Sequence, residues 1–308
     1  MNEKIGNVIL NYTHYSGVDL YSDGDVEDEL LEIVQNYKEE DFNRIIAERK
    51  KWALIYHLSH IRTNIIEWLP INKEETVLEI GSGCGAITGT LANKAKKVTC
   101  IELSKKRSLV NAYRNVEKDN IEILLGNFED IEKNIDEKYD FITLIGVFEY
   151  GELYISSEKP YETFFKTIYK HLNENGKVIV AIENKLGLKY WAGCQEDHVG
   201  RYFEGIEGYT DTHGVKTFSK KELEEIIQNS GFKNYKFYYP YPDYKLPTNI
   251  FSDSYLPKEG ELNNNMRNFD KERIIMFDET KVYNMIIKEG LFPIYSNSYL
   301  VTLEKGRQ

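Results

Sequence analysis

Cysteine and long hydrophobic runs are scarce in this sequence of 308 residues. The three cysteines, Cys84, Cys100 and Cys194, are odd in number and far apart, so they match neither a disulfide framework nor a zinc-binding spacing. No run of about 18 apolar residues occurs, so no membrane span is predicted. The first residues, Met-Asn-Glu-Lys-Ile, lack the basic and apolar regions of a secretory signal. These absences predict a cytoplasmic protein.

An excess of positive charge is also absent. The chain holds 39 Lys and Arg against 50 Asp and Glu, which gives a net charge of −11 at pH 7. Binding to duplex DNA or bulk RNA depends on neutralising phosphates, and no basic stripe is present to do so. We therefore expect no nucleic-acid partner, although a tRNA-like substrate held by a local patch stays open. The length predicts one or two domains with a large core.

The most informative segment covers residues 76–85. Thr76–Ile80 has the pattern of a buried strand, and Gly81, Gly83 and Gly85 follow it in a turn. A helix pattern begins directly afterwards, at residues 86–92. Strand, glycine turn and helix form the nucleotide-binding corner of a doubly wound α/β fold, because glycine lets the backbone approach a ligand closely.

Two acids define the ligand further. Glu79 lies inside the end of the first strand, where a carboxylate repels a pyrophosphate but attracts a cation. Glu102 ends the strand that starts at Lys97, and an acid there can accept hydrogen bonds from both hydroxyls of a ribose. This arrangement resembles the class I S-adenosylmethionine-dependent methyltransferases. Glu79 disfavours the alternative, another Rossmann-type enzyme that uses a dinucleotide.

The resemblance continues along the chain. Further strand patterns lie at Ile121–Leu125, Tyr139–Gly146 and Lys177–Glu183, and a helix pattern at Phe164–Leu172 precedes the last of them. Later strands are predicted at Tyr235–Tyr239 and Ser298–Glu304, with a capped helix between Ser219 and Ser230. The resemblance implies an α/β fold: a doubly wound, seven-stranded, Rossmann-like methyltransferase sheet with an N-terminal helical arm and lid insertions.

The same resemblance implies S-adenosyl-L-methionine as the cofactor and assigns residues to it. Arg62, in a helical segment before the first strand, would hold the ligand's carboxylate, with an ordinary surface arginine as the alternative. The turn after Ile121–Leu125 would cover the adenine. The implied cofactor residues are Arg62, Glu79, Gly81, Ser82, Gly83, Gly85, Glu102, Leu103, Asn127, Phe128 and Gly146.

A long loop, residues 184–217, follows the fifth predicted strand. It is polar, rich in glycine and dense in aromatic residues, and a loop of this length is usually functional. Its E-N-x-x-G-L-K-Y-x-x-G, E-D-H and G-Y segments resemble a bacterial methyltransferase branch associated with surface-polysaccharide glycosyltransferases. That resemblance implies a small-molecule or glycan acceptor and a possible glycosyltransferase partner.

Tyrosine is unusually common, with 23 residues, and it clusters outside the core pattern. Such side chains either stack on a polar acceptor or simply pack half-buried, and the sequence leaves both open. Ligands of a doubly wound sheet bind beyond the carboxyl ends of its strands. The residues predicted to bind the acceptor are Tyr21, Glu149, Tyr150, Asn184, Tyr190, Asp197 and Tyr209.

The predicted organisation has two parts. Residues 1–70 form an N-terminal arm and helices that cover the cofactor site, and residues 71–308 form the methyltransferase domain. The loop 184–217 and an insertion at 240–290 belong to the second part, the insertion as a substrate lid or an interface. We expect Tyr21, His198 and Tyr209 to lie in one cavity beside the cofactor.

The predicted reaction is methyl transfer to a hydroxyl, which needs a base. His198, after two acids in the long loop, and His213 are the candidates. No D-x-x-x-D-N-like metal signature follows the fourth strand, where only Glu149 stands, so we expect no metal. Two alternatives remain: N-methylation of an amine or peptide natural product, and a non-catalytic partner subunit that only binds S-adenosylmethionine.

Overall fold

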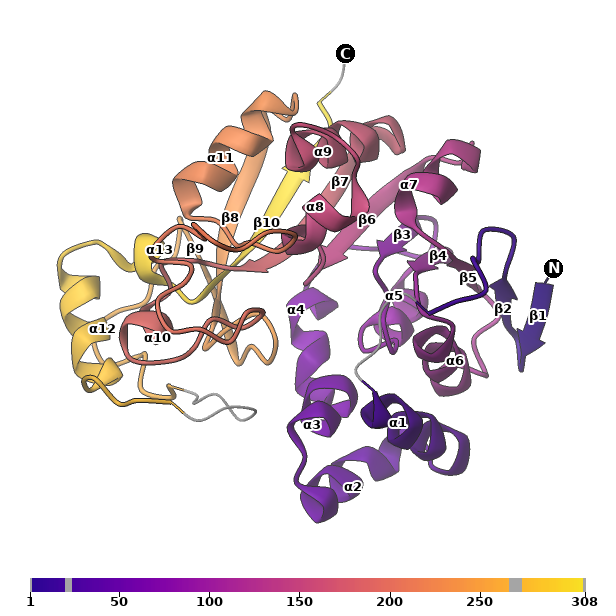
Figure 1. Ribbon diagram of the computed structural model, residues 1–308, viewed down its shortest axis with the longest axis horizontal. Helices are drawn as coiled ribbons and strands as arrows, with labels where there is room; N and C mark the ends of the chain where they lie inside the picture. The colour runs from indigo at the N-terminus through magenta and orange to yellow at the C-terminus, as the bar shows by residue number, and fades with distance from the viewer. Residues whose placement is uncertain (1, 20–23, 266–272, 307–308) are drawn as a thin grey trace. The chain divides into compact units, whose positions relative to one another are not determined.

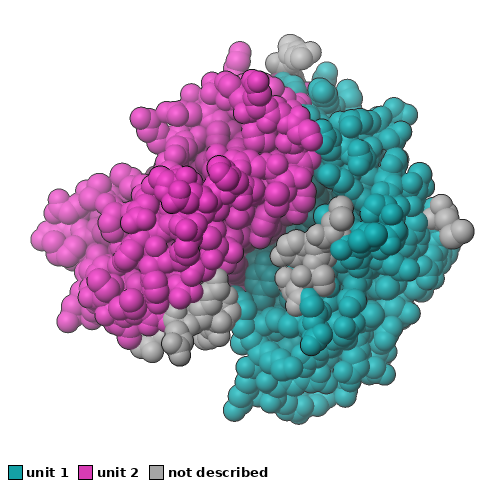
Figure 2. All heavy atoms as spheres, viewed as in Figure 1, with its two compact units in different colours: residues 1–144, 167–177, 307 teal, residues 145–166, 178–306, 308 magenta. Residues whose placement is uncertain are grey.

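The structure is a computed structural model that describes residues 2–19, 24–265 and 273–306. The chain forms two compact units (Figures 1 and 2). Unit 1 contains residues 1–144 and 167–177, and unit 2 contains residues 145–166 and 178–306. The boundary expected at residue 70 lies inside unit 1, and the predicted domain division stays a prediction. No helix in the described parts of the chain is long and apolar enough to cross a membrane.

Unit 1 contains a largely parallel sheet. Its strands run in the order β1-β2-β5-β4-β3-β6, and β2, β5, β4, β3 and β6 are parallel. The middle strands β3, β4 and β6 are almost wholly buried, as parallel strands covered on both faces are. The bounds are β1 Asn2–Ile5, β2 Val8–Asn11, β3 Thr76–Ile80, β4 Lys97–Glu102, β5 Ile121–Leu125 and β6 Tyr139–Ile145.

The first two strands differ from the predicted helical arm. β1 and β2 form an antiparallel hairpin, and β2 pairs with β5. Gly6 makes the tight turn at φ 58°, where a side chain would collide with Val116. Val8 and Leu10 are fully buried and alternate with half-buried neighbours. Four residues are too short a stretch for this alternation to identify a strand from the sequence.

The helical segment that contains Arg62 is broken into short helices. Asp41–Trp68 contains three short α-helices, with Lys50 in a left-handed conformation after the first of them. Ser59 caps the turn His60–Thr63 by accepting a hydrogen bond from Ile61 N. The bounds are α1 Asp25–Asn36, α2 Phe42–Arg49, α3 Trp52–Leu58, α4 Asn64–Glu67, α5 Thr88–Lys94, α6 Lys105–Arg114 and α7 Phe128–Ile131.

Unit 2 continues the secondary structure with strands in the order β7-β10-β8-β9. β10 is antiparallel to β8, and β8 is antiparallel to β9. The strand bounds are β7 Leu172–Glu183, whose first six residues belong to unit 1, β8 Asn234–Tyr241, β9 Asn249–Ser252 and β10 Ser298–Glu304. The helices are α8 Gly151–Tyr154, α9 Pro160–Lys170, whose last four residues belong to unit 1, α10 Leu188–Trp191, α11 Lys220–Asn229, α12 Glu279–Lys288 and α13 Phe292–Tyr295.

The described residues form ten strands, so the prediction of seven was wrong in number. The hairpin β1–β2 and strand β9, which belongs to the 240–290 insertion, are the additional strands. The strands predicted at 76–80, 121–125 and 298–304 have the predicted bounds. β7 starts at Leu172 instead of Lys177, because Asn175 takes a positive φ of 63° and lets the strand continue through the Asn-Glu-Asn-Gly segment.

The capping box of α11 offers a test of local stability. Ser219 accepts a hydrogen bond from Glu222 N, and the Glu222 side chain accepts one from Ser219 N. We expect Ser219→Ala to lower the free energy of unfolding by about 1 kcal/mol, measured by urea denaturation. Ser254→Ala, in an exposed turn, is the control. Equal stability of the two variants would show that the box contributes nothing.

Candidate functional site

The glycine turn of unit 1 has the conformation that its sequence predicts. β3 ends at Ile80, and Gly81, Gly83 and Gly85 all have positive φ values, between 52° and 74°. At Gly85 a Cβ atom would overlap the side chain of Asn111. The turn therefore requires glycine for both backbone conformation and space.

Glu79 is a buried acid inside this corner. One of its carboxylate oxygens accepts a hydrogen bond from Thr88 Oγ1 at 2.7 Å and a weaker one from Cys100 Sγ at 3.5 Å. Burial raises the pKa of Glu79 to about 7, and the nearby charge of Glu102 acts in the same direction. None of the described residues forms an ion pair with Glu79. A ligand with a positive charge would compensate this carboxylate, so the site fits the predicted cofactor.

Glu102, at the end of β4, is buried and organises the backbone around it. Its carboxylate accepts hydrogen bonds from Gly83 N at 2.7 Å and Ser104 N at 2.9 Å. Burial raises the pKa of Glu102, while Arg107 and the backbone donors oppose the shift. Each carboxylate oxygen has a further lone pair, so hydroxyl groups of a ligand can still donate to it. The adjacent Leu103 is half-buried.

Arg62 is not an ordinary surface arginine, because its side chain is 4% exposed. Its guanidinium donates to the Tyr56 hydroxyl at 3.2 Å and stacks over the Tyr56 ring, with 4.5 Å to the centroid. Ser82 is buried in the glycine turn. Burial beside a tyrosine holds the Arg62 guanidinium in place, but a contact to the cofactor stays a prediction.

Three other predicted cofactor residues have protein contacts of their own. Asn127 caps α7 by accepting a hydrogen bond from Glu129 N at 3.2 Å, and Phe128 is buried. Gly146 belongs to unit 2 and has a φ of 71°. A Cβ atom at Gly146 would lie 2.8 Å from the Tyr244 hydroxyl, so this glycine permits a close approach of that tyrosine.

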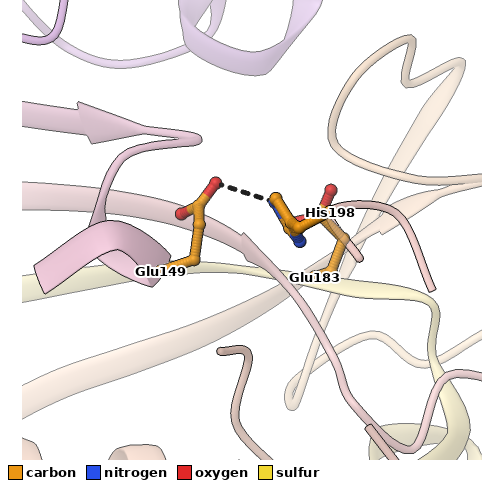
Figure 3. A group of neighbouring side chains, drawn as sticks. All are labelled: Glu149, Glu183 and His198. Carbon is orange, nitrogen blue, oxygen red and sulfur yellow. Dashed lines mark ion pairs between the residues drawn. The ribbon is translucent and has the colours of Figure 1, made fainter. Parts of the chain in front are cut away.

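Unit 2 contains a buried cluster of two glutamates and a histidine (Figure 3). Glu149 follows β6, Glu183 ends β7, and His198 lies in the long loop between α10 and α11. His198 Nε2 is 3.4 Å from Glu149 Oε1 and 3.9 Å from Glu183 Oε2. Both glutamates are at most 1% exposed. We refer to these three residues as the His198 cluster.

Aromatic packing fixes Glu149 in this cluster. The preceding Phe148 is fully buried and stacks on Phe165, with ring centroids 4.2 Å apart. The Glu149 carbonyl oxygen accepts hydrogen bonds from the Tyr161 hydroxyl at 3.2 Å and Lys216 N at 3.1 Å. The carboxylate atom Glu149 Oε2 is buried and has no hydrogen-bond partner among the described residues.

Glu196 holds the other side of the histidine ring. His198 Nδ1 donates to Glu196 Oε1 at 2.9 Å, while Glu196 Oε2 accepts from His198 N at 2.8 Å and Val199 N at 2.6 Å. The Tyr209 hydroxyl also donates to Glu196, at 3.1 Å. Because Glu196 is fixed by four donors, the orientation of the imidazole is fixed as well.

The pKa values of Glu149 and His198 are both raised, but for different physical reasons. Burial raises the pKa of Glu149, and the contact with His198 only partly opposes it. Burial alone would lower the pKa of His198, but Glu183, Glu149 and Glu196 together raise it well above its ordinary value. His198 therefore carries a proton at neutral pH unless another cation replaces it. This state does not suit a free histidine base.

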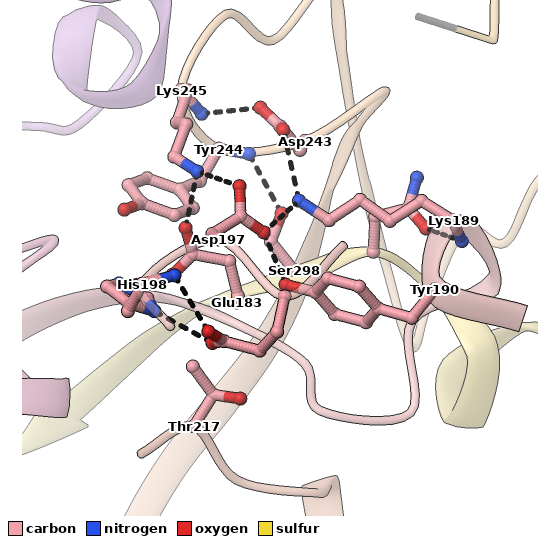
Figure 4. A network of polar contacts seen from close by, with 12 residues as sticks. Glu183, Lys189, Tyr190, Asp197, His198, Thr217, Asp243, Tyr244, Lys245 and Ser298 are labelled. Atoms are coloured by element: carbon pink, nitrogen blue, oxygen red, sulfur yellow. Dashed lines mark hydrogen bonds and ion pairs between the residues drawn. The ribbon is translucent and has the colours of Figure 1, made fainter. Parts of the chain in front are cut away.

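Two lysines, the buried Lys189 and the half-buried Lys245, connect the long loop to the 240–290 insertion (Figure 4). Lys245 Nζ is 2.6 Å from both Glu183 Oε1 and Asp197 Oδ1, and Lys189 Nζ is 2.8 Å from Asp197 Oδ2. Burial favours neutral Asp197, but these two lysines hold the pKa of Asp197 well below its ordinary value. Asp243 also faces Lys189, at 3.7 Å.

The remaining predicted acceptor residues are held mainly by the protein. The Asn184 amide donates to Ile294 O and Ser296 O, and the Tyr190 hydroxyl donates to Asp197. The Tyr209 hydroxyl shares a hydrogen bond with Thr217 at 2.7 Å. Tyr150 packs edge-on against the His198 ring, with centroids 5.5 Å apart. The structure therefore gives Asn184, Tyr190 and Tyr209 structural contacts, and their contact with an acceptor stays a prediction.

His213 is exposed, unlike His198. Tyr21 lies outside the described residues, so the cavity expected for Tyr21, His198 and Tyr209 also stays a prediction. Most of the clustered tyrosines in unit 2 are buried, which favours packing over an open stacking surface for those residues; they are Tyr190, Tyr209, Tyr239, Tyr241 and Tyr244.

Sequence reasoning missed several members of the polar network. Glu183 and Glu196 were part of recognised segments, E-N and E-D-H, but neither was assigned to a site. Lys189 lies in the G-L-K-Y segment, and Lys245 lies 48 residues after Asp197, to which it is bound. A buried-strand pattern that ends in an acid, as at Glu183, is the signal that could have found one of them.

Comparison with known proteins identifies a family. The family model described as a methyltransferase domain matches residues 48–236. The ribosomal RNA small subunit methyltransferase A of Borreliella burgdorferi is 26% identical over 254 residues, which cover 78% of this chain and 81% of the relative. The enzyme of the same name from Borreliella afzelii is 32% identical over 135 residues, 42% of each chain.

Solved structures with similar folds have low sequence identity. A SAM-dependent methyltransferase from Archaeoglobus fulgidus has a TM-score of 0.46 and 14% identity, and the match covers 86% of this chain and 99% of that one. Phosphoethanolamine N-methyltransferase 1 of Haemonchus contortus, in complex with phosphoethanolamine and S-adenosylhomocysteine, has a TM-score of 0.47 and 12% identity, covering 90% and 51%.

Glu79 gives a pH-dependent prediction for the predicted cofactor. With a pKa of about 7, the carboxyl is mostly neutral at pH 6 and mostly ionised at pH 8. A cationic ligand prefers the ionised form, so the affinity for S-adenosylmethionine should rise about tenfold over this interval. Calorimetric titration measures it. Glu79→Gln is the control. It removes the titrating carboxyl, so any pH dependence of the affinity that remains comes from ionisation of the ligand. The same pH dependence in both proteins would contradict the assignment of Glu79 to the cofactor site.

Proposed function

The chain belongs to the methyltransferase family and is an S-adenosylmethionine-dependent enzyme, and on this premise we propose that it methylates a hydroxyl of a small polar, glycan-type acceptor. The observation that supports the proposal is the buried carboxylate of Glu149, whose Oε2 has no hydrogen-bond partner among the described residues. An acceptor hydroxyl can donate to this atom and complete its hydrogen bonding.

The cofactor fits the buried acids of unit 1. Glu79 would face its positive charge, Glu102 would accept from the ribose hydroxyls, and Arg62 would hold its carboxylate. When bound, S-adenosylmethionine supplies an electrophilic methyl group on a sulfonium. The residues of the chain then have to bind the acceptor, exclude water and take up the hydroxyl proton.

We assign the proton to Glu149. Its pKa is raised by burial, so it accepts a proton more readily than an exposed carboxylate does. His198 lies 3.4 Å away and keeps the Glu149 carboxylate oriented, while Glu196 orients His198 in turn. In this arrangement His198 positions the base. The variants below test the role of base that the sequence predicted for His198, and the exposed His213 stays the other predicted candidate.

The acceptor class rests on the branch resemblance of the loop 184–217 and on local chemistry. The long loop supplies His198 and Glu196, and its link to the insertion 240–290 through Asp197 and Lys245 buries the cluster. A glycan hydroxyl is neutral and has a high pKa, so it needs a proton acceptor before it can react. We further propose a cytoplasmic reaction and a glycosyltransferase as a functional partner.

Two other acceptor classes can be weighed against this one. Around His198 the described carboxylates outnumber the lysines that pair with them. Because this surplus of negative charge attracts a cation, it favours an amine acceptor as the second candidate. Similarity to ribosomal RNA methyltransferases raises RNA as a third acceptor. The net charge of −11 opposes RNA, because phosphate binding depends on basic residues.

Glu149→Gln tests the proton transfer. The amide keeps the shape of the side chain but cannot accept the proton, so we expect kcat to fall about 100-fold or more, with unchanged S-adenosylmethionine affinity. Transfer of labelled methyl groups into fractionated glycans and small polar metabolites measures it. Glu174→Gln, an exposed glutamate, is the matched control.

The same series separates the alternatives. For an amine acceptor, loss of the Glu149 charge should appear mainly in KM, since the carboxylate would bind a cation. A large loss of kcat in His198→Ala with full kcat in Glu149→Gln would return the base to His198. Full activity in both variants would contradict a role of this cluster in the reaction.

A further inference from the structure

The His198 cluster combines the features of a metal site, and we propose that Glu149, Glu183 and His198 bind one divalent transition-metal ion. This inference rests on the proposed function, because the ion would activate the acceptor hydroxyl at the same place. The three side chains each offer one ligand atom, and these atoms lie within 4.8 Å of one another (Figure 3).

Two of the three distances between ligand atoms are close to those of a metal site. Ligand atoms bound at about 2.1 Å in tetrahedral geometry are about 3.4 Å apart. His198 Nε2 is 3.4 Å from Glu149 Oε1 and 3.9 Å from Glu183 Oε2. The three residues come from different segments, the turn after β6, the end of β7 and the long loop, so they can surround an ion from different directions.

The surroundings of His198 have the form that a metal-binding histidine needs. A ligating imidazole usually donates its second N–H to a carboxylate, which fixes its tautomer and ring orientation. His198 Nδ1 donates to Glu196 Oε1 at 2.9 Å, and this leaves Nε2 facing Glu149 and Glu183. Glu196 is itself held by two backbone N–H groups.

Charge also favours a cation in the cluster. Among the described residues, the carboxylates in and around the cluster are those of Glu149, Glu183, Glu196, Asp197 and Asp243, and the basic groups paired with them are Lys189, Lys245 and the imidazole of His198. Even when the imidazole of His198 is protonated, these carboxylates outnumber the positively charged groups. Glu149 Oε2 has no hydrogen-bond partner among the described residues, so protein contacts do not satisfy the cluster.

The ligand types indicate which ions fit. Imidazole suits Zn²⁺ and other first-row transition metals, while carboxylates also suit Mn²⁺. Mg²⁺ prefers oxygen ligands and retains several waters, so it fits a buried site with a histidine less well. Three protein ligands leave an open position, which is the arrangement of catalytic rather than structural sites.

The ion would act on the acceptor hydroxyl as a Lewis acid. It lowers the pKa of the hydroxyl, the O–H bond breaks, and the proton passes to the free oxygen of Glu149. The electron pair stays on the acceptor oxygen, where methylation needs it. Lys245 and Lys189 stay paired with Glu183, Asp197 and Asp243, and they limit the negative charge that the ion has to offset.

Metal binding by the full-length protein tests the inference directly. The chain is dialysed against a chelator and titrated with Mn²⁺ by electron paramagnetic resonance and with Zn²⁺ by calorimetry. We expect one ion per chain. Glu149→Gln, Glu183→Gln and His198→Ala should each abolish tight binding, and Glu196→Gln should weaken it about 10- to 100-fold.

Controls separate lost ligands from lost folding. Glu149→Asp keeps a carboxylate and should retain measurable binding, while Glu174→Gln and His60→Ala, both exposed, should bind like the unaltered chain. Thermal melting and S-adenosylmethionine affinity show that each variant is folded. Absence of binding to the unaltered chain, or equal binding by all variants, would overturn the metal site.

Failure of the metal site can be distinguished from failure of the proposed function. Full methyl transfer by the chelated, metal-free protein would reject the ion and leave hydroxyl methylation standing. Stoichiometric binding that depends on the three ligands, together with full kcat in Glu149→Gln, would support the ion and reject the proton transfer. A loss of turnover on chelation that added Mn²⁺ or Zn²⁺ restores is the expected result.

Discussion

Compensation of buried negative charge is the constraint on which the His198 cluster depends. Glu149 and Glu183 are almost completely buried, and a buried carboxylate is stable only when a partner or a raised pKa offsets its loss of solvation. Lys245 compensates Glu183 and Asp197 together, and so connects β7, the long loop and the 240–290 insertion. In unit 2 the long loop thus supplies His198 and Glu196, and the 240–290 insertion supplies Lys245, which offsets the charges of Glu183 and Asp197.

The strand and glycine turn of residues 76–85 could be predicted from the sequence, because their signals are local. The glycines at 81, 83 and 85 follow a buried strand, and the structure gives all of them positive φ values. Glu79 was recognisable because an acid is unusual within a buried-strand pattern. The structure shows that Glu79 is buried, and burial raises its pKa. Strand positions such as 76–80 follow from runs of apolar residues that need no knowledge of distant contacts.

The parts that could not be predicted depend on contacts between distant segments. The hairpin β1–β2 is stabilised as a strand by pairing with β5, more than 100 residues later. The His198 cluster combines residues 149, 183 and 198, and a search for a continuous metal motif after one strand could not find it. The tyrosines were equally ambiguous, since only burial distinguishes Tyr239 or Tyr244 as packing residues.

The most direct test of the account is to identify the atom that receives the methyl group. The protein is incubated with S-adenosylmethionine carrying a ¹³C-labelled methyl group and with fractionated glycans, small amines and ribosomal RNA, and the labelled product is analysed by NMR. The account predicts a methyl group on an oxygen of a glycan-type molecule. A label found on nitrogen, or in RNA, would contradict it.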